Sequence, residues 1–173
     1  MEKVILAGGC FWCIEAAFNH LKGVEKAVSG YCGGSAETAN YQDVCSGLTQ
    51  HAEAVEVTYD PAVIDLVLLL EVFFAIHDPT QENGQGNDLG PQYRSAIFYL
   101  SDKQQQVALD YMQIIQEKFD SAIVTQVVPA TEFYPAEQYH QGYFLQNPQQ
   151  GYCQYVVAPK MRKFAEKFAD KLK

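Results

Sequence analysis

The stretch VILAGGCFWCIEAAFNHLK, residues 4–22, decides how the fold begins and predicts a chemical centre. Its apolar start, residues 4–7, predicts a buried strand, and the two glycines that follow predict a tight turn. From about residue 11 to 22 apolar residues recur with helical spacing, and Gly23 favours a helix end there. Cys10 then faces the positive end of that helix, where unpaired N–H groups favour the reactive thiolate.

Strand and helix patterns alternate along the rest of the chain. Strands are expected over residues 4–7, 24–31, 52–59, 95–100 and 123–128, and helices over about 11–22, 65–76 and 101–119 and from about 159 onward. The first six elements match a ferredoxin-like split β-α-β plait, in which antiparallel strands pack against two helices. The predicted fold class is α+β: a two-layer sandwich of this kind with additional helices, one further strand and an irregular C-terminal tail.

Length and composition indicate a single domain over residues 1–173. With 48% hydrophobic and 19% charged residues, the chain is typical of a globular protein that is long enough for a full core. Two segments are expected outside the packed elements. One is a long surface loop over 79–93, of the kind that is often functional, and the other is a mobile C-terminal segment at about 146–158.

Charge and cysteine usage argue against several classes of protein. The net charge of −9 argues against nucleic acid or an anionic membrane as the main partner, and the basic residues within 160–173 are interpreted as a solvated helix face. We find no secretory signal, and the densest apolar stretch, residues 64–76, is too short to span a bilayer. Five cysteines are an odd set for a disulfide-built secreted domain, so a cytoplasmic location is expected.

Cys10 and Cys13 form a C-x-x-C pair, a spacing found in thiol–disulfide exchange sites and in zinc ligand pairs. The zinc interpretation needs a second pair of ligands, whereas Cys32 and Cys45 stand far apart with no partner close by. We therefore interpret Cys32 and Cys45 as structural and expect no metal or organic cofactor. The exchange interpretation stays open, because two cysteines on one helical turn are within disulfide range.

Two large aromatic residues, Phe11 and Trp12, stand between these cysteines. In thioredoxin-like sites, tryptophan usually precedes the first cysteine instead. Two aromatic rings at the mouth of a thiolate predict a small apolar pocket that suits a methyl or thioether group.

A thiolate that attacks a polar X=O bond also needs an acid to protonate the oxygen, and Glu53 is the candidate. The alternating strand pattern places Glu53 on one face with Val55 and Val57. Burial beside apolar side chains raises the pKa of a carboxyl group, so that it stays protonated near neutral pH. The alternative for Glu53 is a surface glutamate at the end of a strand. The alternative for Tyr41 and Tyr93 is that they are simply packed aromatic residues.

Five blocks, in order, resemble the A-type peptide methionine sulfoxide reductases. They are GGCFW at 8–12; GYCGG at 30–34; YQDVCSG at 41–47 with HAE at 51–53; HDPT at 77–80 with DLGPQYRS at 88–95; and FYPAEQYHQ at 133–141. The resemblance runs from about residue 4 to residue 164, which is nearly the whole chain. Five ordered blocks are far more specific than any one of them.

The resemblance implies how a sulfoxide would be reduced. Cys10 attacks the sulfur of an oxidised methionine, while Glu53 protonates the sulfoxide oxygen. The hydroxyl groups of Tyr41 and Tyr93 help to hold that oxygen, and Asp88 orients the site through its hydrogen bonds. Methionine leaves and Cys10 remains as a sulfenic acid. The implied activity is that of a peptide-methionine (S)-S-oxide reductase, which repairs oxidised proteins.

The resemblance also implies the apolar side of the pocket and the recycling route. Phe11 and Trp12 hold the ε-methyl group of the substrate. A second thiol condenses with the sulfenic acid to form a disulfide. An external thiol, thioredoxin or dithiothreitol, then regenerates the cysteines, so no bound cofactor is implied.

Two departures from the common family pattern leave the resolving thiol open: Cys13 stands where the family often has glycine, and Cys32 stands where it often has alanine. Cys13 is expected on the same helical turn as Cys10. Cys153 matches a tail cysteine that resolves the intermediate in many members. We expect Cys153 and Cys13 to act in relay, with a slight preference for Cys153 as a resolving thiol.

Two rival functions follow from the same residues. A general thiol–disulfide oxidoreductase built on Cys10 and Cys13 would reduce disulfides and would not need Glu53. A non-catalytic binder of oxidised methionine would produce no methionine with dithiothreitol present. For the main hypothesis the expected partners are methionine sulfoxide in oxidised proteins and peptides, and thioredoxin, and the chain is expected to act as a monomer.

Overall fold

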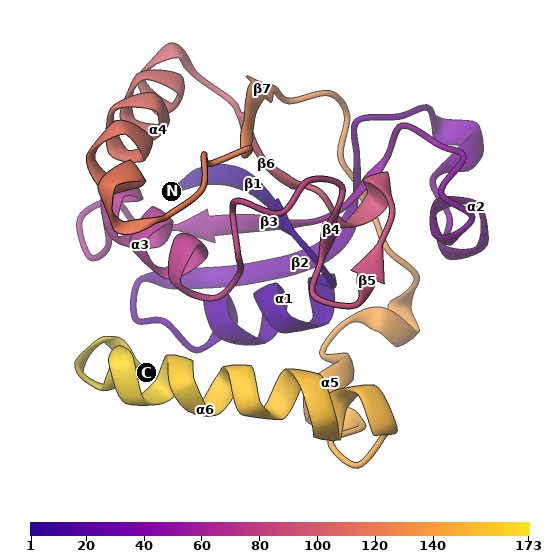
Figure 1. The fold of residues 1–173 in the computed structure, drawn as a ribbon. Helices are drawn as coiled ribbons and strands as arrows, with labels where there is room; N and C mark the ends of the chain where they lie inside the picture. The colour runs from indigo at the N-terminus through magenta and orange to yellow at the C-terminus, as the bar shows by residue number, and fades with distance from the viewer.

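A computed structural model describes all residues of the chain, from Met1 to Lys173. The main strands and helices follow one another in the predicted order (Figure 1). The strands are β1 Glu2–Gly8, β2 Val24–Cys32, β3 Ala52–Tyr59, β4 Gly84–Gln85, β5 Asp88–Leu89, β6 Ser95–Tyr99, β7 Gln126–Pro129 and β8 Tyr134–Pro135. The helices are α1 Phe11–Asn19, α2 Tyr41–Cys45, α3 Leu66–Ala75, α4 Asp102–Ile115, α5 Tyr143–Gln146 and α6 Ala158–Lys167.

The central sheet has the strand order β7-β6-β1-β3-β2-β8. Its inner strands, β6-β1-β3-β2, are antiparallel, which is the arrangement of the split β-α-β plait. Strand β7 adds to one edge parallel to β6, and β8 adds to the other edge against β2. The predicted fold class is therefore confirmed, together with the further strand.

Helix α1 is enclosed on its outer side as well as on the side that faces the sheet. Every residue from 11 to 18 is buried, because the sheet covers one side of the helix and α6 runs along the other (Figure 1). A helix that is apolar nearly all round is stable only in such a place. The first turn of α1 therefore begins inside the molecule and not at its surface.

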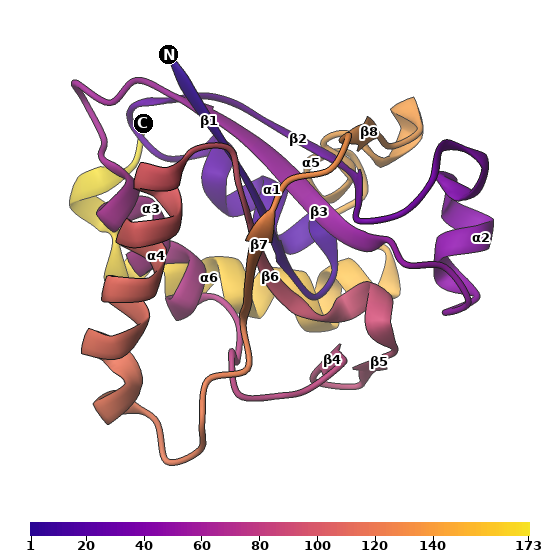
Figure 2. The ribbon, with the colours of Figure 1, turned by 90° about the horizontal axis from the view of Figure 1, so that it is seen from above.

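The opposite face of the sheet is lined by small side chains and covered by a crossing of the chain. Ala54 and Ala96 belong to its buried cluster. Between β7 and β8 the chain passes from one edge of the sheet to the other (Figure 2), and Phe133 packs on the cluster. Gly30 leaves room for this crossing, because a β-carbon there would collide with the Phe133 ring and the Tyr134 carbonyl oxygen.

The C-terminal region is more regular than the sequence predicts. Residues Cys153–Val157 form a π-helical segment that continues directly into α6. Val157 and Phe164 are buried in the main core, so tertiary packing stabilises a segment whose own helical signal is weak. The region 79–93 also has regular structure, since it contains the β4–β5 hairpin and a 3₁₀ turn at Pro91–Tyr93.

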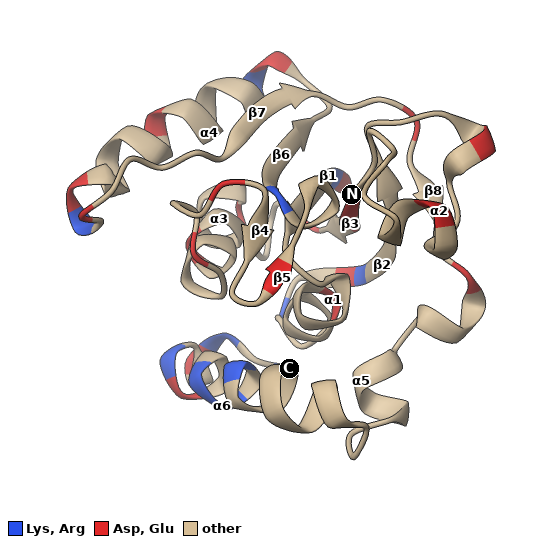
Figure 3. Cartoon of the chain, turned by 45° about the vertical axis from the view of Figure 1, so that its right-hand side comes forward, with Lys and Arg blue, Asp and Glu red and all other residues tan.

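The basic side chains of the C-terminal region gather on α6, toward the end that lies away from α5 (Figure 3). Arg162, Lys163 and Lys167 are exposed, which agrees with the solvated face that the sequence indicates. None of the helices has both the length and the apolar character needed to cross a lipid bilayer.

Replacing Gly30 by valine is expected to lower the free energy of unfolding, because the new side chain must displace the crossing at Phe133 and Tyr134. Overpacking of this kind costs about 1–3 kcal/mol. Chemical denaturation measures the difference. Gly151→Ala is the matched control, since a β-carbon at Gly151 meets nothing within 4 Å. Equal unfolding free energies for the two variants would contradict the tight crossing.

Candidate active site

One pocket of about 240 Å³ brings the predicted site residues together. It is lined by Cys10, Phe11, Trp12, Tyr41, Glu53, Asp88 and Tyr93, and also by Gln150 and Tyr152. These residues come from the start of α1, from α2, β3 and the β5 region, and from the segment before α6. The fold is therefore what assembles the pocket from segments that are distant in sequence.

Cys10 is the N-cap residue of α1. Strand β1 ends at Gly8, and Gly9 follows with φ +92°, a conformation that side-chain-bearing residues rarely adopt. This turn places Cys10 where the sheet meets the helix. The first N–H of the helix, that of Phe11, donates a hydrogen bond to Glu53 Oε1 over 3.2 Å. The same helix end therefore contacts both the cysteine and the carboxyl group.

Glu53 is almost fully buried, with 1% of its surface exposed. As predicted, it shares a strand face with Val55 and Val57, which belong to the core around α1. Burial raises the pKa of Glu53 to about 8; the nearby Asp88 charge adds to the rise, and the Phe11 N–H bond opposes it. At neutral pH the carboxyl group is therefore mostly protonated.

The ionisation of Cys10 differs from the sequence-based prediction. Burial raises the pKa of Cys10 well above that of a free cysteine, and the neighbouring Glu53 and Cys13 add to the rise. The Trp12 N–H at the helix start lowers the pKa, as the helix-end argument expects, but it does not outweigh desolvation. The prediction of a resting thiolate is wrong: Cys10 and Glu53 are both protonated before substrate binds.

Tyr41 is the first residue of α2, a helix that Asn40 caps by accepting the Asp43 N–H over 2.9 Å. The Tyr41 N–H donates to Glu137 Oε2 over 3.0 Å, which ties the helix start to the segment before α5. Burial raises the pKa of the Tyr41 hydroxyl, and the neighbouring Cys45 adds to the rise. The hydroxyl therefore stays a hydrogen-bond donor at neutral pH.

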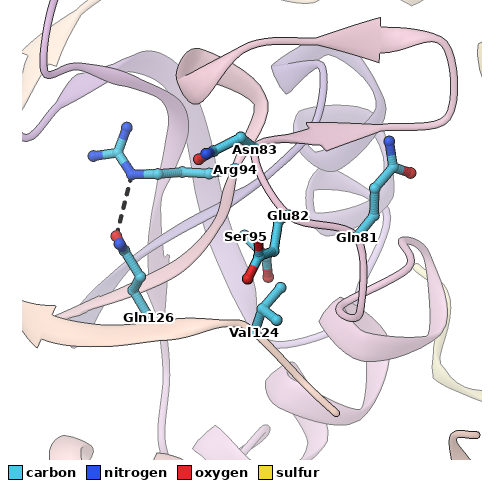
Figure 4. Close-up of a pocket in the computed structure, with 7 residues that line it drawn as sticks. All are labelled: Gln81, Glu82, Asn83, Arg94, Ser95, Val124 and Gln126. Atoms are coloured by element: carbon cyan, nitrogen blue, oxygen red, sulfur yellow. Dashed lines mark hydrogen bonds between the residues drawn. The ribbon is translucent and has the colours of Figure 1, made fainter. Parts of the chain in front are cut away.

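Tyr93 ends the short 3₁₀ turn, and the next residue, Arg94, fixes that turn in place. The Arg94 guanidinium donates to the Pro91 carbonyl over 2.8 Å and to the Gln50 carbonyl over 3.0 Å. A third bond runs to Gln126 on β7, in a polar hollow that shares no residue with the candidate pocket (Figure 4). Burial raises the pKa of the Tyr93 hydroxyl, so this group also remains a donor.

Asp88 lies in the β4–β5 hairpin, where it pairs with Gln85. Gln85 is anchored by two hydrogen bonds to the Asp78 backbone, at 2.8 Å and 3.0 Å, so the hairpin has a fixed base. The Asp88 carboxylate accepts a hydrogen bond from the Tyr152 hydroxyl. Asp88 is thus linked to the segment that carries Cys153.

Phe11 and Trp12 form the apolar side of the pocket, and the segment 137–143 packs behind them. The Trp12 indole N–H donates to His140 Nδ1 over 3.1 Å, and its ring stacks on Tyr143 with centroids 3.9 Å apart. The Phe11 ring lies 5.2 Å from the His140 ring. Rings that are held in this way present a fixed apolar surface, which suits a methyl or thioether group.

The two candidate resolving cysteines lie behind the pocket wall. Cys13 is 2% exposed and Cys153 is fully buried, and neither lines the pocket. All five cysteines are free thiols. Cys32 is buried and Cys45 is half-buried. A disulfide between Cys10 and Cys153 therefore needs the Cys153 side chain to leave its packing.

Sequence reasoning missed Gln150 and Tyr152 as pocket residues. Both belong to the stretch NPQQGYC, residues 147–153, in which only the cysteine drew attention. A glutamine and a tyrosine in a polar tail have no periodic pattern, so nearness to Cys153 is the one signal that could have indicated them. Nor did the sequence indicate that His140 supports Trp12.

The arrangement combines a thiol, a protonated carboxyl group, two phenol hydroxyls and an apolar wall in one pocket. These groups can protonate and reduce a polar X=O bond that carries a small apolar substituent. The structure contains no group of three His, Cys, Asp or Glu side chains that could hold a metal ion.

Comparison with known proteins places the chain among close relatives. The family model for peptide methionine sulfoxide reductase matches residues 2–172. Peptide methionine sulfoxide reductase MsrA of Chromobacterium violaceum is 56% identical over 175 residues, covering 98% of this chain and 97% of that protein. The reduced form of Mxr1 from Saccharomyces cerevisiae has a TM-score of 0.84 at 38% identity, covering 88% of each chain.

A second yeast structure, Mxr1 in complex with Trx2, has a TM-score of 0.60 at 30% identity and covers 82% of this chain and 84% of that chain. The sequence match and the structural match thus both extend over most of the molecule, and the residues matched by the family model include every segment that contributes to the pocket. The chain belongs to the peptide methionine sulfoxide reductase family, in its MsrA branch.

Proposed function

We propose that this enzyme uses Cys10 and Glu53 to reduce the S epimer of methionine sulfoxide, in oxidised proteins and as the free amino acid, to methionine. The observation that carries the proposal is a carboxyl group with a pKa of about 8 in the same pocket as a thiol. A sulfoxide becomes a good electrophile when its oxygen is protonated, so the acid and the nucleophile must act together. The activity would repair oxidative damage to proteins.

In the first step, the Cys10 sulfur attacks the sulfoxide sulfur while Glu53 gives its proton to the sulfoxide oxygen. The hydroxyl group then passes from the substrate sulfur to the Cys10 sulfur: the substrate S–O bond and the new S–S bond break, an S–O bond to Cys10 forms, and methionine leaves with Cys10 as a sulfenic acid. The substrate sulfur gains two electrons, which the Cys10 sulfur loses, and the Cys10 proton replaces the one that Glu53 gave. Since both groups start protonated, no net charge has to be created in a buried pocket.

The other pocket residues would orient the substrate. The Tyr41 and Tyr93 hydroxyls remain donors because burial raises the pKa of each, and we propose that they bind the sulfoxide oxygen. Phe11 and Trp12 would receive the methyl group. Asp88 would position Tyr152, which also lines the pocket, through the hydrogen bond between the two side chains.

A second thiol is then needed to resolve the sulfenic acid as a disulfide, with loss of water. We propose that Cys153 is the resolving thiol that condenses first with the Cys10 sulfenic acid, and that Cys13 then takes over the disulfide in relay. The π-helical segment that begins at Cys153 supports this order, because such segments are often found at functional sites and are less regular than an α-helix. Unwinding this segment would release Cys153 from the core.

The reductant in this proposal is external. A solved complex of Mxr1 with Trx2 supports thioredoxin as the partner that opens the final disulfide, and dithiothreitol would replace it in an assay. Five free cysteines fit a reducing compartment, which is the basis for proposing a cytoplasmic location. We also propose that the chain acts as a monomer, since this chain by itself supplies the thiol, the acid and the apolar wall that the proposed reaction needs.

A general thiol–disulfide exchange activity of the Cys10–Cys13 pair is not favoured. Exchange requires that the attacked sulfur be reached by a foreign thiolate, yet Cys13 is 2% exposed. The exchange hypothesis also leaves Glu53 without a part in the chemistry.

Glu53→Gln is expected to lower kcat/KM for methionine sulfoxide by about 10²- to 10⁴-fold, because it removes the general acid but keeps the shape of the side chain. A coupled assay with dithiothreitol measures the loss. Glu56→Gln, on the same strand, is the matched control, since Glu56 pairs with Lys3 at the sheet surface and does not line the pocket. Full sulfoxide turnover by Glu53→Gln would refute the mechanism.

The rate of methionine formation in a single turnover is expected to fall as the pH rises through about 8, the pKa of Glu53. Below this pH the carboxyl group is protonated and can donate; above it the group is ionised and repels the developing thiolate. Rapid-quench measurements with no reductant isolate this step. The same falling limb in Glu53→Gln would assign the titration to another group.

Cys153→Ser is expected to form one equivalent of methionine without reductant and then to accumulate sulfenic acid at Cys10. The oxygen transfer needs only Cys10, whereas recycling by thioredoxin needs the resolving thiol. Thiol counting and a sulfenic-acid probe measure the outcome, with Cys13→Ser in parallel and Cys32→Ala as the control. An unchanged disulfide yield in Cys153→Ser would transfer the resolving function to Cys13.

A further inference from the structure

Residues 133–143, which include the block FYPAEQYHQ, take no part in the proposed chemistry, yet partly buried polar contacts hold them to β2 and to α1. The Gln141 side chain accepts the Ser29 N–H over 3.1 Å and donates to the Ser29 carbonyl over 2.9 Å. The next residue, Gly142, donates its N–H to the Glu15 carboxyl group over 2.8 Å. This segment is therefore fastened to both β2 and α1.

Glu15 is a carboxyl group in the middle of the enclosed helix α1, with 3% of its surface exposed. No Lys or Arg side chain pairs with it. Its partners are hydrogen-bond donors: the Gly142 N–H lies 2.8 Å and 3.1 Å from its two oxygens, and the Ser29 hydroxyl lies 3.3 Å from Oε1. A buried carboxyl group is costly, and an apolar residue would fill a helix core without that cost.

The contact at Gly142 leads directly to Trp12. Tyr143 follows Gly142 and begins α5, and its ring stacks on Trp12 with centroids 3.9 Å apart and 9° between the planes. His140, two residues before Gly142, accepts the Trp12 indole N–H over 3.1 Å. The bond from Glu15 thus fixes the backbone between the two residues that hold the Trp12 ring.

Glu15 and Trp12 are three residues apart on α1, so they lie on one side of the helix. The contacts therefore form a closed ring: α1, Gly142, Tyr143 and back to α1. The stack of Trp12 on Tyr143 alone would leave the indole some freedom to tilt. With the hydrogen bond between Glu15 and Gly142 added, the orientation of the indole is restrained more strongly.

We propose that Glu15 is a positioning residue of the active site, which holds Gly142 so that Tyr143 and His140 set the face of Trp12 that receives the substrate methyl group. The effect of Glu15 on turnover rests on the proposed function. Its effect on the Trp12 ring does not, because that effect exists without substrate.

The test compares Glu15→Leu, which keeps much of the side-chain volume but removes both acceptor oxygens, with the parent chain by steady-state kinetics and by tryptophan fluorescence. Trp12 is the only tryptophan of the chain, and 9% of its surface is exposed, so the emission reports the surroundings of this one ring. We expect a red-shifted emission and a rise in KM for methionine sulfoxide of about fivefold or more, with kcat within about twofold. Ser29→Ala is the matched control: it removes the other partner of Glu15, keeps the Gly142 contact, and should leave emission and KM unchanged.

A double-variant cycle tests whether Glu15 acts on Trp12 through Tyr143. Tyr143→Leu removes the stack on Trp12 and should raise KM like Glu15→Leu, and the double variant should be no worse than the poorer single variant. Unchanged emission and KM in Glu15→Leu would overturn the proposal, as would a fall in kcat alone or full additivity in the cycle. If Glu15→Leu does not fold, Tyr143→Leu decides: normal emission and KM there would refute the path through Tyr143. A parent chain without sulfoxide turnover would refute the proposed function, while the emission would still decide on Glu15.

Discussion

The burial of the Glu53 carboxyl group is the constraint on which the rest of the structure depends. In water such a group is ionised at neutral pH, whereas between the sheet and the start of α1 it keeps its proton. This enclosure is formed by the sheet, by the start of α1 and by segments distant in the sequence that line the same pocket. The same enclosure keeps the Cys10 thiol neutral, so the nucleophile and the acid are both uncharged.

The plait was predictable because its local signals agree with its tertiary structure. The alternation in β3 separates Val55 and Val57 on one face from Ala52 and Ala54 on the other, although both faces are buried. Asp65 and Ser101 cap α3 and α4 through the bonds that their positions suggest. Residues 130–157 were not predictable in the same way. Strand β8, helix α5 and the π-helical segment are short, and they are stabilised by contacts with β2, Trp12 and the main core.

The pocket residues were predictable from residue type and motif resemblance, but their protonation was predictable only for Glu53. A helix-end argument considers only the N–H groups near Cys10. The burial that decides its pKa comes from segments distant in the sequence, among them the one that carries Gln150 and Tyr152. Glu15 was missed for a related reason. On an isolated α1 it marks an ordinary polar position, and its enclosure is apparent only once the outer side of the helix is covered.

The two outermost strands of the sheet both end in proline, β7 at Pro129 and β8 at Pro135. Proline has no N–H group to offer to a further strand, and both strands are short. Exposed sheet edges recruit extended segments of other chains and so begin aggregates. An enzyme that works on oxidatively damaged proteins encounters many partly unfolded chains with exposed extended segments. Sheet edges that end in proline would allow the enzyme to bind such substrates repeatedly without joining their aggregates.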